Sequence, residues 1–190
     1  MEPTNDEIQP IPHGLQIVTG NNSLRTPPSN AGINIDTNAG PIQPIQITCP
    51  RTSYNPPSYP ADSNGLDGVG IQDPNNAGAG AGFPDQNCDG LYSPLRTDCH
   101  FPSCYNPAAG LSNFKENMAF PSSAGLTGGK LDCPPGWIHI PHLFMEVYWA
   151  TQAFADMWTP GQGKQPFVLS NGDATGYGYH CDFVSALPLE

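Results

Sequence analysis

The chain has 190 residues and a mass of 20.2 kDa, and its 17 acidic residues against 6 Lys plus Arg give a formal net charge of -11. That length suits one domain with its own core and is short for two. The negative charge repels phosphate groups, so we expect neither nucleic acids nor anionic lipid surfaces as partners. No stretch approaches the ~20 apolar residues of a membrane span.

The composition favours turns and loops. Glycine (21 residues) and proline (23 residues) supply nearly a quarter of the chain, just under the level at which composition alone indicates disorder. Short β-branched runs bounded by Pro, Asn and Gly, at residues 14–20, 33–35 and 42–49, predict short strands joined by turns. Residues 50–88 are poor in apolar side chains and predict a long surface loop.

Six cysteines are scattered along the chain without the C-x-x-C pair that is typical of zinc and redox sites. This spacing in a Pro/Gly-rich, Lys-poor chain predicts disulfides and an oxidising compartment. Six cysteines allow fifteen pairings, so the connectivity stays open. We interpret Cys99 and Cys181 as unpaired and expect the other four to be bridged, namely Cys49, Cys88, Cys104 and Cys133.

Residues 1–10 are acidic and polar, and we expect them to be disordered. They have neither the basic region nor the apolar region of a secretory signal peptide. Because disulfides need an oxidising compartment, we expect this chain to be a truncated form of a longer protein that is extracellular or lies in the cell wall.

The strongest structural pattern follows Pro141, which disfavours a helix across the neighbouring histidines. A strand with a period of two residues is predicted over residues 142–149. One face, expected in the core, carries Leu143, Met145, Val147 and Trp149. The other face has the mixed character of a cleft wall and carries His142, Phe144, Glu146 and Tyr148. Further strands are predicted at residues 166–169 and 177–184.

Short strands and frequent turns, with no clear amphipathic helix, predict a mainly β fold. We expect sandwich-like sheets with long Pro/Gly-rich loops, stabilised by disulfides. Trp137, Trp149 and Trp158 can supply stacking platforms for sugar rings, although aromatic side chains are more often part of the core. His139 and His142 are three residues apart, which sends them to opposite faces of a strand, and His100 has no visible partner.

Residues 169–183 read LSNGDATGYGYHCDF and closely resemble the signature of a fungal family of unknown function, DUF1996, whose domains are often fused to WSC carbohydrate-binding modules. Shorter pieces agree in order, among them LRTPP at 24–28, FPSC at 101–104 and MAFP at 118–121. The resemblance implies a secreted protein whose activity is not established. The family's histidine-rich N-terminal half has no counterpart here, so residues 11–185 are expected to be the C-terminal part of a single domain with an incomplete site, followed by a tail at residues 186–190.

Four residues are candidates for a polar, catalytic centre: His180, Asp182, Asp173 and Glu146. His180 and Asp182 are two apart on a predicted strand and project to one face, which Asp173 can join from the preceding turn. Such a group can bind a metal or act as an oriented acid/base pair. The alternative is a structural hydrogen-bond network that pins the glycine-rich loop. Glu146 is either a cleft carboxylate with a raised pKa or a strand residue that reaches solvent.

The acidic, aromatic chain and the resemblance together favour a polysaccharide as ligand or substrate. A glycosidase needs two suitably placed carboxylates, and Glu146 with Asp182 or Asp173 is a candidate pair. The alternative is a non-catalytic extracellular or wall-associated structural protein. The sequence names no cofactor or metal.

Overall fold

The computed structural model describes residues 3–29, 32–49, 79–85, 88, 95–159, 161–162 and 165–186. Within these ranges the chain forms the strands β1 (Gln16–Gly20), β2 (Ile45–Thr48), β3 (Ala79–Gly80), β4 (Leu95–His100), β5 (Cys104–Tyr105), β6 (Met118–Ala119), β7 (Ile138–His139), β8 (Phe144–Trp149) and β9 (His180–Val184). Two 3-10 helices follow β5 and β8, namely η1 (Pro107–Ala109) and η2 (Thr151–Met157). The named strands pair in antiparallel fashion, which confirms the predicted mainly β fold.

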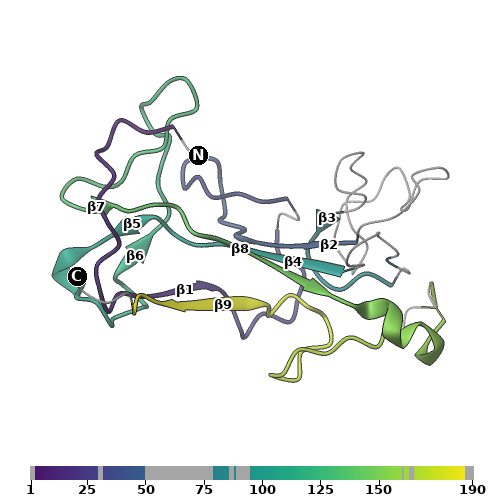
Figure 1. Ribbon diagram of the computed structural model, residues 1–190. Coiled ribbons are helices and arrows are strands. Elements are labelled where there is room, and N and C mark those ends of the chain that lie inside the picture. Colours follow the sequence, from purple (N-terminus) through teal and green to yellow (C-terminus); the bar gives the residue numbers. More distant parts are fainter. Residues whose placement is uncertain are drawn as a thin grey trace.

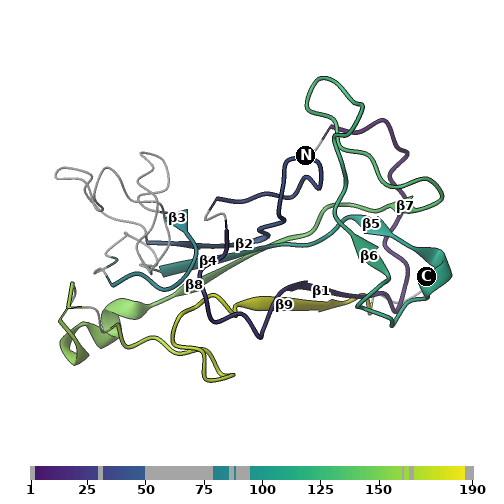
Figure 2. The same cartoon turned by 180° about the vertical axis from the view of Figure 1, so that it is seen from behind.

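The described strands form three sheets, with the orders β3-β2-β4-β8, β1-β9 and β6-β5-β7. Figures 1 and 2 show the β1-β9 pair beneath the central sheet that contains β2, β4 and β8, with the small β5-β6-β7 sheet at one end of these two layers. Neighbouring layers of antiparallel sheet give the sheet-on-sheet arrangement that the sequence predicts.

The central strand β4 decides which side chains enter the space between the two layers. Its sequence, LRTDCH, alternates in character, and successive side chains of a strand point to opposite faces. Leu95, Thr97 and Cys99 point to the side of the sheet on which β1 and β9 lie, and each is 2% exposed or less. A disulfide from Cys99 to Cys181 on β9 fixes the inward direction of these side chains. The alternate residues of β4 therefore face outward, away from β1-β9.

Two apolar clusters fill the interior. Burying one such side chain fully contributes about 1.5–3 kcal/mol. The larger cluster runs between the layers toward the β5-β6-β7 sheet and contains Leu15, Ile17, Ile45, Cys99, Phe101, Tyr105, Ile140 and Cys181. The smaller cluster, against which Phe167 and Leu169 pack, contains Ile47, Cys49, Phe83, Cys88 and Leu95.

Three disulfides join Cys49 to Cys88, Cys104 to Cys133, and Cys99 to Cys181. The first two use the four cysteines that we expected to be bridged. The interpretation of Cys99 and Cys181 as unpaired is wrong, because these residues, 82 apart in sequence, meet where β4 faces β9. Loss of a native disulfide typically costs about 2–5 kcal/mol, since the cross-link restricts the unfolded chain.

One expectation about the chain's course is wrong, and a second needs correction in its described part. Residues 166–169 form no strand but an irregular segment. The predicted loop over residues 50–88 lies largely outside the described residues, yet its described part includes β3, which pairs with β2, and the buried side chain of Phe83. That part is therefore not a surface loop.

The face of β8 that was expected in the core is only partly covered. Met145 is 37% exposed and Trp149 is 46% exposed, whereas Val147 between them is half-buried. β8 is the last strand in the central sheet's order, so the β1-β9 layer shields it less than it shields β4. Trp149 therefore presents part of its aromatic ring to solvent.

The segment after η2 returns over the smaller cluster and depends on a residue without a side chain. Gly176 has φ of +80°, and a Cβ atom built on it would lie 2.8 Å from the backbone nitrogen of Phe83. That nitrogen donates a hydrogen bond to the carbonyl oxygen of Thr175 at 2.8 Å. Glycine is therefore required here both for the backbone conformation and for the close approach.

We predict that Gly176→Ala lowers the free energy of unfolding by about 3 kcal/mol, because strain at positive φ adds to overpacking against Phe83. Gly172→Ala is the matched control: Gly172 has φ of +82° but no atom within 4 Å of its built Cβ. We expect the control to lose only about 1 kcal/mol. Urea denaturation of both variants checks this, and equal losses would contradict the close packing of residues 170–180.

Candidate functional site

The outer face of the central sheet carries a charged group built from β4 and β8. Asp98 and Glu146 lie directly opposite each other in the β4-β8 register. Arg96 lies on the same face as Asp98, with Nη2 at 2.9 Å from Asp98 Oδ2 and Nη1 at 3.6 Å from Glu146 Oε1. The hydroxyl of Tyr148 donates to Glu146 Oε2 at 3.3 Å. One guanidinium therefore bridges two neighbouring carboxylates.

Asp98 is the unusual member of this group. Its side chain is 1% exposed, and its Oδ1 makes no hydrogen bond in the described structure. Burial raises the pKa of Asp98 to about 6, because the Arg96 guanidinium offsets only part of the desolvation and Glu146 adds repulsion. Sequence reasoning missed Asp98, although the alternation of β4 was a signal that could have found it.

Glu146 and the pair of His180 and Asp182 lie on opposite faces of the two-layer structure. Cys181 points into the space between the layers, so its neighbours His180 and Asp182 project from the other face of β9. Glu146 lies beside Asp98 on the outer face of the central sheet. The structure therefore keeps His180 and Asp182 together, as the sequence predicts, and separates them from Glu146. Their catalytic roles stay a prediction.

Asp173 is fully buried within the glycine-rich loop. It accepts hydrogen bonds from the backbone nitrogen and hydroxyl of Thr175 at 2.8 and 2.6 Å, and from the backbone nitrogen of Gly178 at 2.7 Å. Burial alone would raise the pKa of Asp173, but these bonds and the Arg25 guanidinium outweigh it and hold the pKa below its usual range. These contacts correspond to the structural hydrogen-bond network, which was the alternative to a catalytic or metal-binding role for Asp173.

A mainly apolar cavity of 540 Å³ lies where β4, β8, η2 and residues 167–171 meet. Trp149 and Phe154, which line it, are 46% and 52% exposed. Trp149 is fixed by a hydrogen bond from Nε1 to Thr97 Oγ1 at 3.0 Å. Polar groups of Asn171 and His180 also line this cavity. Its size and its mix of aromatic walls with a few polar groups are typical of a ligand site.

A second cavity, of 750 Å³, lies along the outer face of β1 and β9. His180 and Asp182 line it, and Phe114 and Lys115 come from the segment before β6. His180 therefore lines both cavities, whereas Asp173 and Glu146 line neither. Asp182 is exposed on this face.

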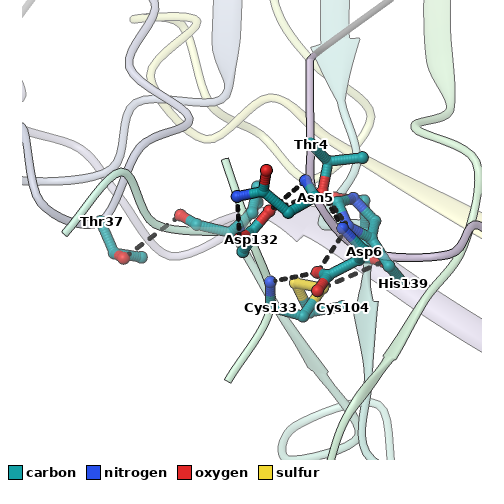
Figure 3. The surroundings of a disulfide bond; sticks show 10 residues. Thr4, Asn5, Asp6, Thr37, Cys104, Asp132, Cys133 and His139 are labelled. Atoms are coloured by element: carbon teal, nitrogen blue, oxygen red, sulfur yellow. Dashed lines mark hydrogen bonds and ion pairs between the residues drawn. A yellow bond between two sulfur atoms is a disulfide. The ribbon is translucent and has the colours of Figure 1, made fainter. Parts of the chain in front are cut away.

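A third polar cluster joins the N-terminal segment to the disulfide between Cys104 and Cys133 (Figure 3). Asp6 Oδ2 accepts a hydrogen bond from the backbone nitrogen of Cys133 at 2.7 Å and lies 3.0 Å from His139 Nδ1. Asp132 accepts hydrogen bonds from Thr4 and Asn5. Residues 4–6, within the stretch that we expected to be disordered, thus contact β7 and the segment before it.

The two histidines that flank Pro141 have separate partners. His139 contacts Asp6, as described above, and His142 Nε2 lies 3.3 Å from His100 Nδ1. The expectation that His100 has no partner is wrong, because β8 brings residue 142 beside the end of β4. His139 lies on β7 and His142 lies before β8, so the two residues share no strand and the expected opposite faces do not apply to them.

Asp98 gives a pH dependence that can be tested with Asp98→Asn. Between about pH 4 and about pH 6, the folded protein binds more protons at Asp98 than the unfolded chain does. The contribution of Asp98 to the free energy of unfolding therefore falls by about 3 kcal/mol as the pH rises through this window. The variant lacks this titration. We expect the free energy of unfolding of the variant minus that of the wild type to increase across this window in urea denaturation. A flat or decreasing difference would contradict the raised pKa.

Asp173 and Asp182 provide a matched pair for separating structural from functional roles. In Asp173→Asn, the amide cannot accept all the hydrogen bonds of the carboxylate, and a buried donor from Gly178 or Thr175 loses its partner. We expect this variant to lose about 2 kcal/mol of unfolding free energy. The exposed Asp182→Asn should change it by less than about 0.5 kcal/mol. Thermal and urea denaturation measure both, and an equally stable Asp173→Asn would argue against the network.

The sequence model of one family, Domain of unknown function (DUF1996), matches residues 1–186. No curated protein and no solved structure matches the chain. In the part of the chain that the structure describes, no helix is long and apolar enough to cross a membrane. The family match extends over nearly the whole sequence and agrees with the resemblance carried by residues 169–183. This chain therefore belongs to the DUF1996 family.

Proposed function

We propose that this protein binds a neutral polysaccharide at the 540 Å³ cavity between β8, η2 and residues 167–171. The observation that carries the proposal is the pair of exposed aromatic side chains, Trp149 and Phe154, in the wall of that cavity. A sugar ring has apolar C–H faces and a hydroxyl edge. Aromatic side chains offer flat apolar surfaces for the faces, and neighbouring polar groups can hydrogen-bond the hydroxyls.

The exposure of the aromatic groups supports a ligand at this place. Contiguous apolar surface exposed on a protein commonly marks a binding site. Trp149 on β8 and Phe154 on η2, which both line the cavity, are 46% and 52% exposed. The formal net charge of -11 favours a neutral polysaccharide over an anionic one, because like charges repel.

His180 connects this proposal with the predicted polar centre. It lies in the wall of the apolar cavity and in that of the second cavity. We assign it the role of a hydrogen-bonding contact to sugar hydroxyls. Asp182, in the second cavity, is in position to extend the contact along the face of β9.

A hydrolytic role would rest on Glu146 and Asp98, which are neighbouring carboxylates, and on the raised pKa of Asp98. General acid catalysis needs a carboxyl group that reaches the substrate. The side chain of Asp98 is 1% exposed and lies against Arg96, so it is shielded from direct contact with a sugar. Binding without cleavage is therefore the better supported function.

Phe154→Ala tests the proposed site. We expect it to weaken retention on the insoluble polysaccharide that the wild type binds by about tenfold, because it removes one stacking surface. Phe144→Ala is the matched control: Phe144 is 48% exposed but lines neither cavity. Depletion of protein from solution over a panel of insoluble polysaccharides measures both.

Equal weakening by the two variants would place binding elsewhere, and no retention by any neutral polysaccharide would contradict the proposal. Release of reducing sugars in the same panel distinguishes cleavage from binding. Retention without release supports the binding role, whereas release that is lost in Glu146→Gln would favour the hydrolytic role. A structural wall protein would be retained on wall material equally with and without Phe154.

A further inference from the structure

The cluster in Figure 3 brings together three kinds of metal-ligating group. Asp6, Cys133 and His139 each offer one ligand atom, and these three atoms all lie within 4.8 Å of one another. Cys104 is bonded to Cys133 and lies directly opposite His139 in the β5-β7 register. A carboxylate, an imidazole and two sulfur atoms therefore converge on one place.

In the oxidised protein the two sulfur atoms are joined, and a disulfide is a poor metal ligand because it lacks the thiolate charge. Reduction changes the donor set. A phosphine reductant and water supply two electrons and two protons, which convert Cys104 and Cys133 into two thiols and the phosphine into its oxide. Metal binding then releases the two thiol protons. The resulting set of two sulfurs, one nitrogen and one oxygen is suited to zinc.

The geometry requires only small movements. Zinc binds sulfur at about 2.3 Å and nitrogen or oxygen at about 2.0–2.2 Å, so the ligand atoms of a tetrahedral site lie about 3.3–3.8 Å from one another. Three donors already lie within 4.8 Å of one another. His139 is 4% exposed and is held by Asp6, so its ring is fixed beside the sulfurs. The fourth donor, Cys104, becomes free to turn when its bond to Cys133 is broken.

Accessibility favours reduction at this place. Cys133 is half-buried, although its partner Cys104 is buried. In the other two disulfides both cysteines are buried: Cys49, Cys88, Cys99 and Cys181. Thiol–disulfide exchange and reduction depend on access to the sulfur that is attacked. Mild reduction should therefore open the bond between Cys104 and Cys133 before it opens the others.

We propose that the protein with a reduced Cys104–Cys133 pair binds one zinc ion through Asp6, Cys104, Cys133 and His139. Zinc then ties the N-terminal segment to β5 and β7, as the hydrogen bond from Cys133 to Asp6 does in the oxidised protein. Formation of the disulfide expels the metal. The site is thus open to zinc before oxidation and closed afterwards.

The test uses the full chain, reduced mildly with a phosphine, with the reduced pair identified by alkylation and mass spectrometry. Cobalt(II) is titrated first, because tetrahedral thiolate coordination gives an intense visible absorption, and zinc(II) is then used to displace it. We expect one ion per chain in the reduced protein and none in the oxidised protein. Asp6→Ala and His139→Ala should each weaken binding by at least about 100-fold, because loss of an outer partner of a metal site already costs about 10–100-fold.

Glu7→Ala and His142→Ala are the matched controls, because they remove an exposed carboxylate next to Asp6 and a nearby imidazole outside the donor set. They should keep the affinity within a few fold of the wild type. Circular dichroism checks that each variant is folded. If Asp6→Ala is not folded, Asp6→Asn is used in its place. Binding by the oxidised protein, no binding by the reduced protein, or binding that Asp6→Ala or Asp6→Asn leaves unchanged would each overturn the proposal.

Discussion

The disulfide between Cys99 and Cys181 is the constraint on which the two-layer arrangement depends. It joins the central strand β4 to the last strand β9 through the middle of the larger apolar cluster. By fixing which residues of both strands point inward, it also fixes the two outer faces. Asp98 and Glu146 face out on one side, and His180 and Asp182 face out on the other. The division of polar groups into separate sites follows from this one bond.

Much of the fold could be predicted from local patterns, because β1, β2, β8 and β9 are β-branched or aromatic runs bounded by turn residues. The central strand was not predicted, since Arg96 and Asp98 interrupt its apolar character and only its alternation indicates a strand. Without β4, neither the partner of Cys99 nor the pairing of Asp98 with Glu146 could be seen. A disulfide between residues 82 apart in sequence can be predicted only from the fold, because the spacing of the cysteines does not indicate it.

The candidate site shows the same limit. Sequence periodicity correctly placed His180 and Asp182 on one face, because alternation along a strand is a local property. It could not place Glu146 relative to them, because that depends on how two sheets pack. The exposed aromatic side chains of β8 were expected partly in the core, but the strand lies last in the order of its sheet. Incomplete covering of this strand leaves Trp149 in the wall of the proposed polysaccharide site.

The most direct measurement of polysaccharide binding at this cavity is an NMR titration with a soluble oligosaccharide, followed through the tryptophan indole N–H signals. Trp149 lines the cavity with its Nε1–H bonded to Thr97, whereas Trp137 does not line it. We predict that the Trp149 signal moves with saturating oligosaccharide while the Trp137 signal stays in place. A shift confined to Trp137, or no shift of Trp149 with an oligosaccharide of a polymer that retains the protein, would contradict the proposed site.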